Sequence, residues 1–282
     1  MNKRKSLEEL NLLDKFLFDE AMDDPENVKT MLDIILSQNT NLKQLPQTEK
    51  EQRTSTDNRQ IRLDVYAIDE DDVIYEVEAQ KENTHNLPKR SRLYQGIIDS
   101  KLLPPGVVDF NLLNEVLIVL IMPFDLFGYG LYRYTFQMKC QEIPELKLDD
   151  GATRIFLNTK GKHPESVSPE LIELLKYMEH STDEVSEACE SKRIQEMHRR
   201  VCQIRASEKT EVKYMQSWEE RIMIKQEGIA EGRIEGEKAL LKSLIEKKMA
   251  KKYSAEQISA MLEVDVSEVE NIMKEIQNEK YL

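Results

Sequence analysis

Residues 61–80, IRLDVYAIDEDDVIYEVEAQ, contain two runs of alternating polar and apolar side chains, separated by a short acidic stretch. Alternation with a period of two is typical of β-strands. We therefore expect an antiparallel hairpin whose loop is 70–72. In this register Asp64 lies directly opposite Glu78. The hairpin is the strongest restriction that the sequence places on the fold, because its register decides which side chains share a face.

The expected hairpin has one polar and one apolar face. The polar face carries Arg62, Asp64, Tyr66, Glu76, Glu78 and Gln80. The apolar face carries Leu63, Val65, Ala67, Val73, Tyr75, Val77 and Ala79. A slip of one residue would turn the carboxylates toward the apolar face, so the pattern specifies the register well.

The opposition of Asp64 and Glu78 creates an electrostatic conflict. Directly opposed residues have Cβ atoms roughly 4.5–5.5 Å apart, and two carboxylates at that distance repel each other. A hard divalent cation such as Mg²⁺ would resolve the conflict. Gln80 projects from the same face and could orient a water or contact a phosphate oxygen. From the pattern alone, a solvated hairpin face is an equally good interpretation.

The rest of the first 180 residues or so indicates an α/β fold. Residues 115–123, EVLIVLIMP, form a continuously apolar run, which is typical of a strand buried on both faces. A hydrophobic fraction of 40% in 282 residues is enough for a buried core. We also expect strands at 132–138 and 153–157 and a loop or weak strand at 38–58. Helices are expected at 9–37 (with a break near 23–25), from just after Pro88 through 91–101, and at 168–180.

From residue 183 onward the strand pattern disappears and charged helical sequence dominates. Residues 228–237, GIAEGRIEGE, are rich in glycine, which lowers helix stability by up to about 1 kcal/mol per residue. This E-G-rich tract is therefore either a marginal helix or a linker. We accordingly expect a core domain at 1–182 and a helical extension at 183–282.

Two short helical units end the extension, at 254–262 and 267–277. Ser254 and Ser267 are their candidate N-caps, and the pair resembles a helix-turn-helix. The preceding segment, 238–252, holds six lysines and one glutamate. It could contact DNA nonspecifically, or it could be the solvated face of a coiled-coil-like helix. Oligomerisation through the C-terminal helices is a competing role for the extension.

Several segments of the chain resemble those of the PD-(D/E)XK nuclease family transposases, also called recombination-promoting nucleases, and they occur in the same order. Asp64, Glu78 and Gln80 form a D–x13–E-x-Q pattern, a variant of the family motif with Gln in place of Lys. The resemblance extends from about residue 8 to about residue 277. The segments that carry it are LLDKFLFDEAM, RLDVYAIDEDDVIYEVEAQ, LPKRSRLYQGIIDSKLL, FDLFGYGLYRYTF, LDDGATRIFLNTKG and the tract E-G-x-x-E-G-R.

The resemblance implies a restriction-endonuclease-like α/β core, with a mixed central sheet flanked by helices, and DNA cleavage that depends on Mg²⁺ or Mn²⁺. It implies that Asp64 and Glu78 bind the metal and that Gln80 fills the place of the motif lysine. Asp14 stands where the family has an acidic residue in its first helix, so it is either an outer metal ligand or a helix-cap or surface residue. Because Gln brings no charge, we expect slower or more metal-dependent cleavage.

A basic cluster follows the motif and opens the helix expected from just after Pro88. Its functional interpretation is phosphate contact and support of the site, and the alternative is a helix with a charged exterior. The candidate DNA-binding residues are Arg62, Lys89, Arg90, Arg92, Tyr94 and Gln95. The net charge of −13 predicts modest, salt-sensitive nonspecific affinity for DNA, but it does not exclude a nuclease.

Other classes of protein receive less support. The three cysteines are odd in number and far apart, which indicates a reducing compartment, and no run of about 18 apolar residues predicts a membrane helix. We therefore expect a cytoplasmic protein. The four histidines are scattered, so we expect no zinc site.

The leading prediction is a Mg²⁺-dependent DNA endonuclease of the recombination-promoting type. The second is a catalytically silent DNA-binding or regulatory protein on the same fold. A third, weaker interpretation is a helical protein-binding adaptor built on 183–282.

Overall fold

The computed structural model describes residues 4–52 and 61–279. Its centre is a six-stranded sheet with the strand order β1-β2-β3-β4-β6-β5. Strands β3, β4 and β6 are parallel, and the other neighbouring pairs are antiparallel. The strands are β1 (Gln47–Gln52), β2 (Ile61–Ile68), β3 (Ile74–Ala79), β4 (Val116–Met122), β5 (Arg133–Phe136) and β6 (Ala152–Asn158). The sheet is therefore mixed, as the resemblance implied, and the apolar run at 115–123 is one of its two central strands.

The hairpin of β2 and β3 has the expected register over its paired residues. Tyr66 lies opposite Glu76 and Val65 opposite Val77, while the amide of Asp69 bonds to the carbonyl of Val73 across the loop. The paired residues end at Val65 and Val77, whereas β3 continues beside β4 as far as Ala79. Asp64 therefore lies at the point where β2 separates from β3.

One residue of the hairpin departs from the expected alternation. Leu63 is buried in a cluster with Tyr66 and Ile74, and not in the cluster that holds Val65. The expectation that Leu63 and Val65 share a face is therefore wrong. Leu63 lies beyond the last residues that β2 pairs with β3, although it still pairs with Lys50 of β1.

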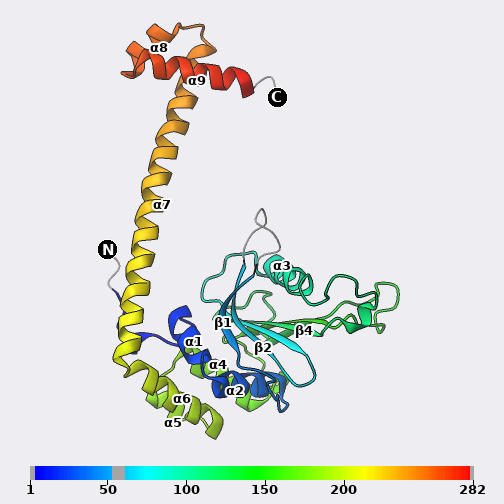
Figure 1. Cartoon of the computed structure of the whole chain (residues 1–282). Coiled ribbons are helices and arrows are strands. Elements are labelled where there is room, and N and C mark those ends of the chain that lie inside the picture. The colour runs from blue at the N-terminus through cyan, green and yellow to red at the C-terminus, as the bar shows by residue number, and fades with distance from the viewer. Residues whose placement is uncertain (1–3, 53–60, 280–282) are drawn as a thin grey trace. The chain divides into compact units, whose positions relative to one another are not determined.

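Helices cover both faces of the sheet (Figure 1). On one face they pack against Val65, Val77, Val119 and Ile155. These helices are α1 (Lys15–Met22), α2 (Pro25–Leu36), α4 (Pro169–Glu179), α5 (Asp183–Glu187) and α6 (Lys192–Arg205). On the other face, α3 (Leu87–Asp99) buries Leu87 and Ile98 against Ile118 of β4. Three short 3-10 helices cover Leu7–Glu9, Phe110–Leu112 and Pro164–Ser166.

Local signals account for most helix boundaries. The Asp24 side chain accepts from the Glu26 amide at the start of α2, which ends the first helix at the predicted break. Ser168 caps α4 by accepting from the Leu171 amide at 3.2 Å, and Pro169 stands in the first turn as expected. A loop or weak strand is expected at 38–58, and the structure has the strand β1 in this segment. Residues 53–58 lie outside the described residues.

The C-terminal part is entirely helical over its described residues. It contains α7 (Glu208–Met249), α8 (Ala255–Leu262) and α9 (Val266–Glu279), whose apolar side chains form a small core around Ile245, Ile258 and Val269. The E-G-rich tract lies inside α7 and is therefore helix. Ser254 caps α8 as predicted, but Ser267 is not a cap, because α9 already begins at Val266.

The chain divides into two compact units, 1–214 and 215–282. Helices α5 and α6, which follow the boundary expected at residue 182, pack against α1, α2 and α4 of the first unit. They do so because Ile194, Met197 and Val201 contribute to the same core as the sheet. None of the helices in the described ranges combines the length and the apolar composition needed to cross a bilayer.

Candidate active site

Three carboxylates gather where β2 separates from β3. Asp64 comes from β2, and Glu76 and Glu78 come from the same face of β3. All three are buried, with exposed fractions of 5%, 0% and 7% respectively. Burial of three acids in one place is costly unless cations or protons neutralise them.

Two cationic side chains from opposite sides of the sheet reach these acids. The Lys15 ammonium, from α1, lies 2.5 Å from Asp64 Oδ1 and 3.1 Å from an oxygen of Asp19. The Arg90 guanidinium, from α3, donates through Nη2 to both Glu78 Oε1 and Gln80 Oε1. The site is therefore assembled from four elements, with one cation for each of the two motif carboxylates.

The pKa values reflect this crowding. Burial raises the pKa of Glu78 to about 7, although the Arg90 guanidinium opposes the rise. Burial also raises the pKa of Glu76 well above its ordinary value, and the neighbouring Glu78 and Asp64 add to the effect. The pKa of Asp19 rises to about 7 through burial, against the influence of Lys15. The cluster thus carries more acid than its two cations neutralise.

The carboxylate oxygens that have no hydrogen-bond partner in the cluster fit a hard divalent metal. Both carboxylate oxygens of Glu76 and Oε2 of Glu78 are buried without a hydrogen-bond partner among the described residues. Unpartnered buried oxygens of this kind call for an ion or a proton. Since the donor set consists of carboxylates alone, it suits Mg²⁺ or Mn²⁺ and not a softer metal.

Asp14 does not join this cluster through a direct contact. It occupies the N-cap position of α1, where its Oδ2 accepts from the Asn11 amide at 3.1 Å and its Oδ1 lies 2.5 Å from the Lys81 ammonium. Of the two roles left open for Asp14, these contacts favour the helix-terminal one. The next residue, Lys15, is the one that contacts Asp64.

The candidate DNA-binding residues separate into two groups. Lys89 and Arg92 are exposed on α3, and Arg62 is exposed on β2. Tyr94 and Gln95 are buried, with exposed fractions of 8% and 7%. The Arg90 guanidinium lies 5.8 Å from the centre of the Tyr94 ring, and Gln95 donates to Asp99 Oδ1 at 2.9 Å. Of the two roles expected for Tyr94 and Gln95, burial favours support of the site over contact with phosphate.

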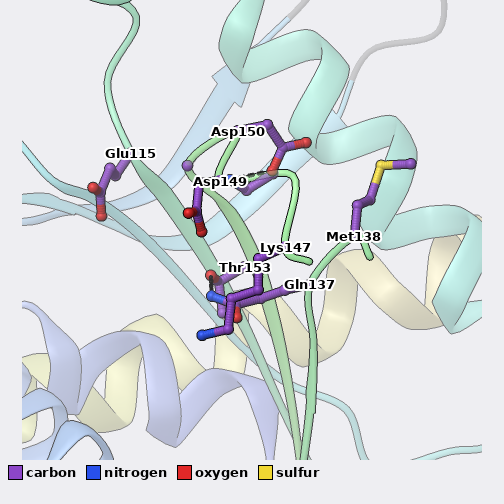
Figure 2. Close-up of a pocket in the computed structure, with 9 residues that line it drawn as sticks. Glu115, Gln137, Met138, Lys147, Asp149, Asp150 and Thr153 are labelled. Atoms are coloured by element: carbon purple, nitrogen blue, oxygen red, sulfur yellow. Dashed lines mark hydrogen bonds between the residues drawn. The ribbon is translucent and has the colours of Figure 1, made fainter. Parts of the chain in front are cut away.

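A separate hollow of about 190 Å³ lies at the opposite end of the central strands (Figure 2). It is bordered by Glu115, just before β4, and by Asp150 and Gly151, just before β6. Because β3, β4 and β6 are parallel, their amino ends lie at the edge of the sheet away from Glu78 and Gln80. This hollow is therefore not part of the carboxylate cluster.

The comparison with family models decides the family. The model of the PD-(D/E)XK nuclease family transposases matches residues 12–228, a span that includes the whole sheet and all residues of the carboxylate cluster. The chain belongs to this family. No curated protein and no solved structure matches the chain. Membership in the family suggests a nuclease or transposase-like role with DNA as the substrate and a divalent metal as the cofactor.

Sequence reasoning missed three residues of the cluster, namely Lys15, Asp19 and Glu76. Lys15 and Asp19 carry one signal, because opposite charges four residues apart share a helix face, but nothing local connects them to Asp64. Glu76 was assigned to the polar face of the hairpin, yet its complete burial could not be read from the alternation.

Proposed function

We propose that the chain is a Mg²⁺-dependent DNA endonuclease of the recombination-promoting type, for which Mn²⁺ can substitute, and that it acts in the cytoplasm. The observation that carries the proposal is the convergence of Asp64 and Glu78 at the separation of β2 from β3. Both are buried, and Glu78 keeps one oxygen without a partner among the described residues. The family of the chain and its three free cysteines support the reaction and the compartment.

In this proposal Asp64 and Glu78 would hold the metal, and the buried Glu76 would add carboxylate oxygens beside them. A metal bound there would lower the pKa of a water and stabilise charge on the scissile phosphate. Arg90 holds Glu78 and Gln80 in one orientation, since its Nη2 donates to both. The Gln80 amide nitrogen donates to the Glu82 carbonyl at 2.6 Å, so Gln80 acts as a positioning residue that brings no charge.

Cleavage of supercoiled plasmid by the full chain tests this function. We expect nicking or linearisation with Mg²⁺ or Mn²⁺, none with EDTA, and a loss of at least about 100-fold in Asp64→Ala and in Glu78→Ala, in line with the electrostatic stabilisation that such groups supply. Asp71→Ala, which removes an exposed hairpin carboxylate outside the cluster, is the control and should cleave like the wild type. Equal cleavage by all four proteins would contradict the proposal.

One observation favours a catalytically silent DNA-binding protein as the second candidate. Lys15 and Arg90 already pair with Asp64 and Glu78, and Gln80 supplies no replacement charge. Salt-dependent DNA binding without cleavage in any of Mg²⁺, Mn²⁺ or Co²⁺ would favour this candidate. Mg²⁺ binding that disappears in Asp64→Ala, together with cleavage, would favour the endonuclease.

We also infer that α7 mediates self-association between two copies of the chain. Gly228, Gly232 and Gly236 recur every four residues on one face of the helix, and a Cβ placed on any of them would meet no described atom within 4 Å. Ile229 and Leu240 border this face and are 62% exposed each. A row of glycines bordered by exposed apolar side chains lets a second helix of the same kind pack closely against it.

A further inference from the structure

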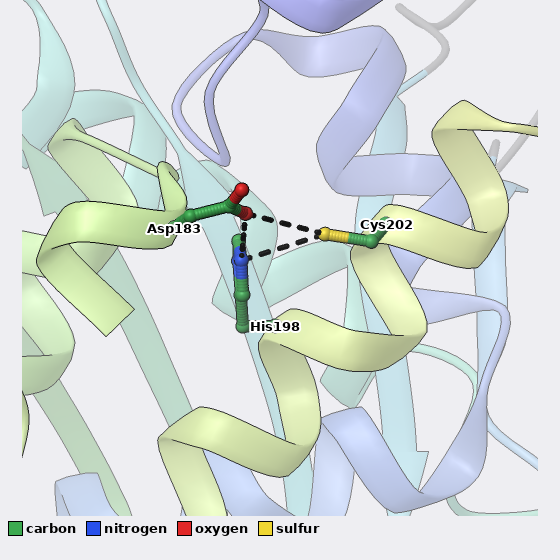
Figure 3. A group of neighbouring side chains, drawn as sticks. All are labelled: Asp183, His198 and Cys202. Carbon is green, nitrogen blue, oxygen red and sulfur yellow. Dashed lines mark hydrogen bonds and ion pairs between the residues drawn. The ribbon is translucent and has the colours of Figure 1, made fainter. Parts of the chain in front are cut away.

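A second cluster of metal-binding side chains lies among the helices on the α1 face of the sheet, away from the carboxylates. Asp183 begins α5, and His198 and Cys202 stand one turn apart on α6. Figure 3 shows the three side chains pointing toward one another. Their ligand atoms, one oxygen, one nitrogen and one sulfur, all lie within 4.8 Å of each other.

The distances in this cluster are close to those of a tetrahedral metal site. His198 Nε2 lies 2.8 Å from Asp183 Oδ1 and 3.4 Å from Cys202 Sγ, and Sγ lies 3.9 Å from Oδ1. Tetrahedral Zn²⁺ with ordinary bond lengths separates its ligand atoms by about 3.3–3.6 Å. The hydrogen-bonded Asp183–His198 pair has to open by roughly 0.5 Å, and Asp183 Oδ1 has to approach Cys202 Sγ by roughly 0.3 Å. Asp183 can move that far, because its side chain is 85% exposed.

The histidine is held in a fixed orientation by its other ring nitrogen. His198 Nδ1 lies 3.0 Å from the hydroxyl of Tyr177, which is completely buried in α4. The two rings stand edge to face with their centres 5.5 Å apart. An outer partner on the second nitrogen is the usual arrangement for a metal-binding histidine, since it fixes the ring and the tautomer. Nε2 is thereby directed at Asp183 and Cys202.

The space for a fourth ligand is also present. A cavity of about 420 Å³ is bordered by Asp183, Cys202, Arg205 and Glu8. The cavity is large enough to admit water to the metal. Three protein ligands and one open position are a common arrangement for bound zinc.

We propose that Asp183, His198 and Cys202 bind a divalent transition metal of the Zn²⁺ class, with a water in the fourth position. The thiolate and imidazole select a softer metal than the all-carboxylate set of Asp64, Glu76 and Glu78. The metal ties α5 to α6 beside the buried Tyr177. This site is independent of the proposed nuclease activity, which uses other residues.

A cysteine nucleophile is the competing use of the same residues, and the structure disfavours it. Burial raises the pKa of the Cys202 thiol, and the neighbouring Asp183 raises it further, although Arg205 opposes the rise. In reactive cysteines the nearby positive charge outweighs burial and lowers the pKa. His198 also faces Asp183 at a shorter distance than it faces the sulfur.

The sequence carries one signal for this site, although the scattered histidines indicated no zinc site. His198 and Cys202 are four residues apart, the spacing that puts two side chains on one helix face. The third ligand, Asp183, lies in another helix, so its participation follows only from the packing of α5 on α6.

Cobalt titration of the full, reduced, metal-free chain tests the proposal. We expect one equivalent of Co²⁺ to bind with a thiolate-to-cobalt absorption band, and Zn²⁺ to displace it. Cys202→Ser should lose this band and His198→Gln should weaken binding at least tenfold. Asp183→Asn changes a side chain that is 85% exposed, so we expect the fold to be kept, and it should weaken binding about tenfold.

Two control variants complete the experiment. Cys140→Ser removes a cysteine elsewhere in the chain, and Asp64→Ala removes a carboxylate of the first cluster. Both should keep the cobalt band unchanged. The proposal is overturned if no thiolate band forms, if the band survives Cys202→Ser, or if Asp183→Asn binds cobalt as tightly as the wild type.

Discussion

At the scale of single residues, Lys15 is the side chain whose importance the sequence least suggested. Its ammonium lies 2.5 Å from Asp64 Oδ1, although the two residues are 49 positions apart. Its pKa is raised, because Asp64 and Asp19 outweigh the opposing effect of burial. The Lys15 ammonium, carried by α1, therefore lies where a metal bound to Asp64 would also place its positive charge.

We expect Lys15→Met to strengthen Mg²⁺ binding, because the ammonium competes with the metal for Asp64. The Lys15 side chain is 44% exposed, and a pair with that much exposure contributes up to roughly 1 kcal/mol. This corresponds to a decrease in the Mg²⁺ dissociation constant of up to about fivefold. Isothermal titration calorimetry of the full chain at pH 8 measures it.

Lys29→Met is a matched control for this prediction. Lys29 pairs with Asp33 on α2 at 2.8 Å, with the same spacing of four as Lys15 and Asp19, but it takes no part in the carboxylate cluster. Its replacement should leave Mg²⁺ affinity unchanged. Weaker Mg²⁺ binding in Lys15→Met would show that Lys15 supports the metal site and does not compete for it.

At the scale of elements, α3 combines two roles within one turn. Arg90 is turned inward to Glu78 and Gln80, while Lys89 and Arg92 face solvent. The sequence predicted a basic helix after the motif, but it could not separate inward from outward cations. That division follows from which side of α3 packs against β3 and β4.

We expect Lys89→Ala and Arg92→Ala each to weaken DNA binding for all sequences alike. Each lost phosphate contact should reduce the slope of log Kd against log salt by about one. Fluorescence anisotropy with a duplex in EDTA, over a series of salt concentrations, measures this slope. Lys147→Ala, an exposed lysine beside the hollow of Figure 2, is the control and should leave the slope unchanged. An unchanged slope in both α3 variants would mean that DNA does not contact this helix.

At the scale of the whole molecule, the long helix α7 has the surface that we connect with self-association. We expect Ile229→Glu combined with Leu240→Glu to convert an oligomer of the full chain to a monomer, because each places a charge where two helices would pack. Size-exclusion chromatography with light scattering measures the mass. Gln216→Glu, an exposed change elsewhere on α7, should leave the mass unchanged. A monomeric wild type would contradict the inference.

The hairpin, the central strand, the helix break near Pro25 and the cap at Ser168 could be predicted because their signals are local. A period of two, a continuous apolar run and a capping side chain each act over a few residues. The same reasoning set Asp64 directly opposite Glu78, but the paired residues of the hairpin end at Val65 and Val77, so these two carboxylates lie just beyond the ladder. This reasoning was wrong at Leu63, where β2 has separated from β3, and at Ser267, where α9 begins one residue earlier.

By itself, the sequence predicted the family and the mixed α/β core, and it singled out Asp64 and Glu78 as candidate metal ligands. Only the tertiary structure decided that Lys15 contacts Asp64, that Glu76 is fully buried and that Asp183 joins His198 and Cys202. The physical reason is the same in all three cases. Charge neutralisation, burial and the proposed metal coordination depend on separate elements that meet only when helices pack on the sheet and on each other.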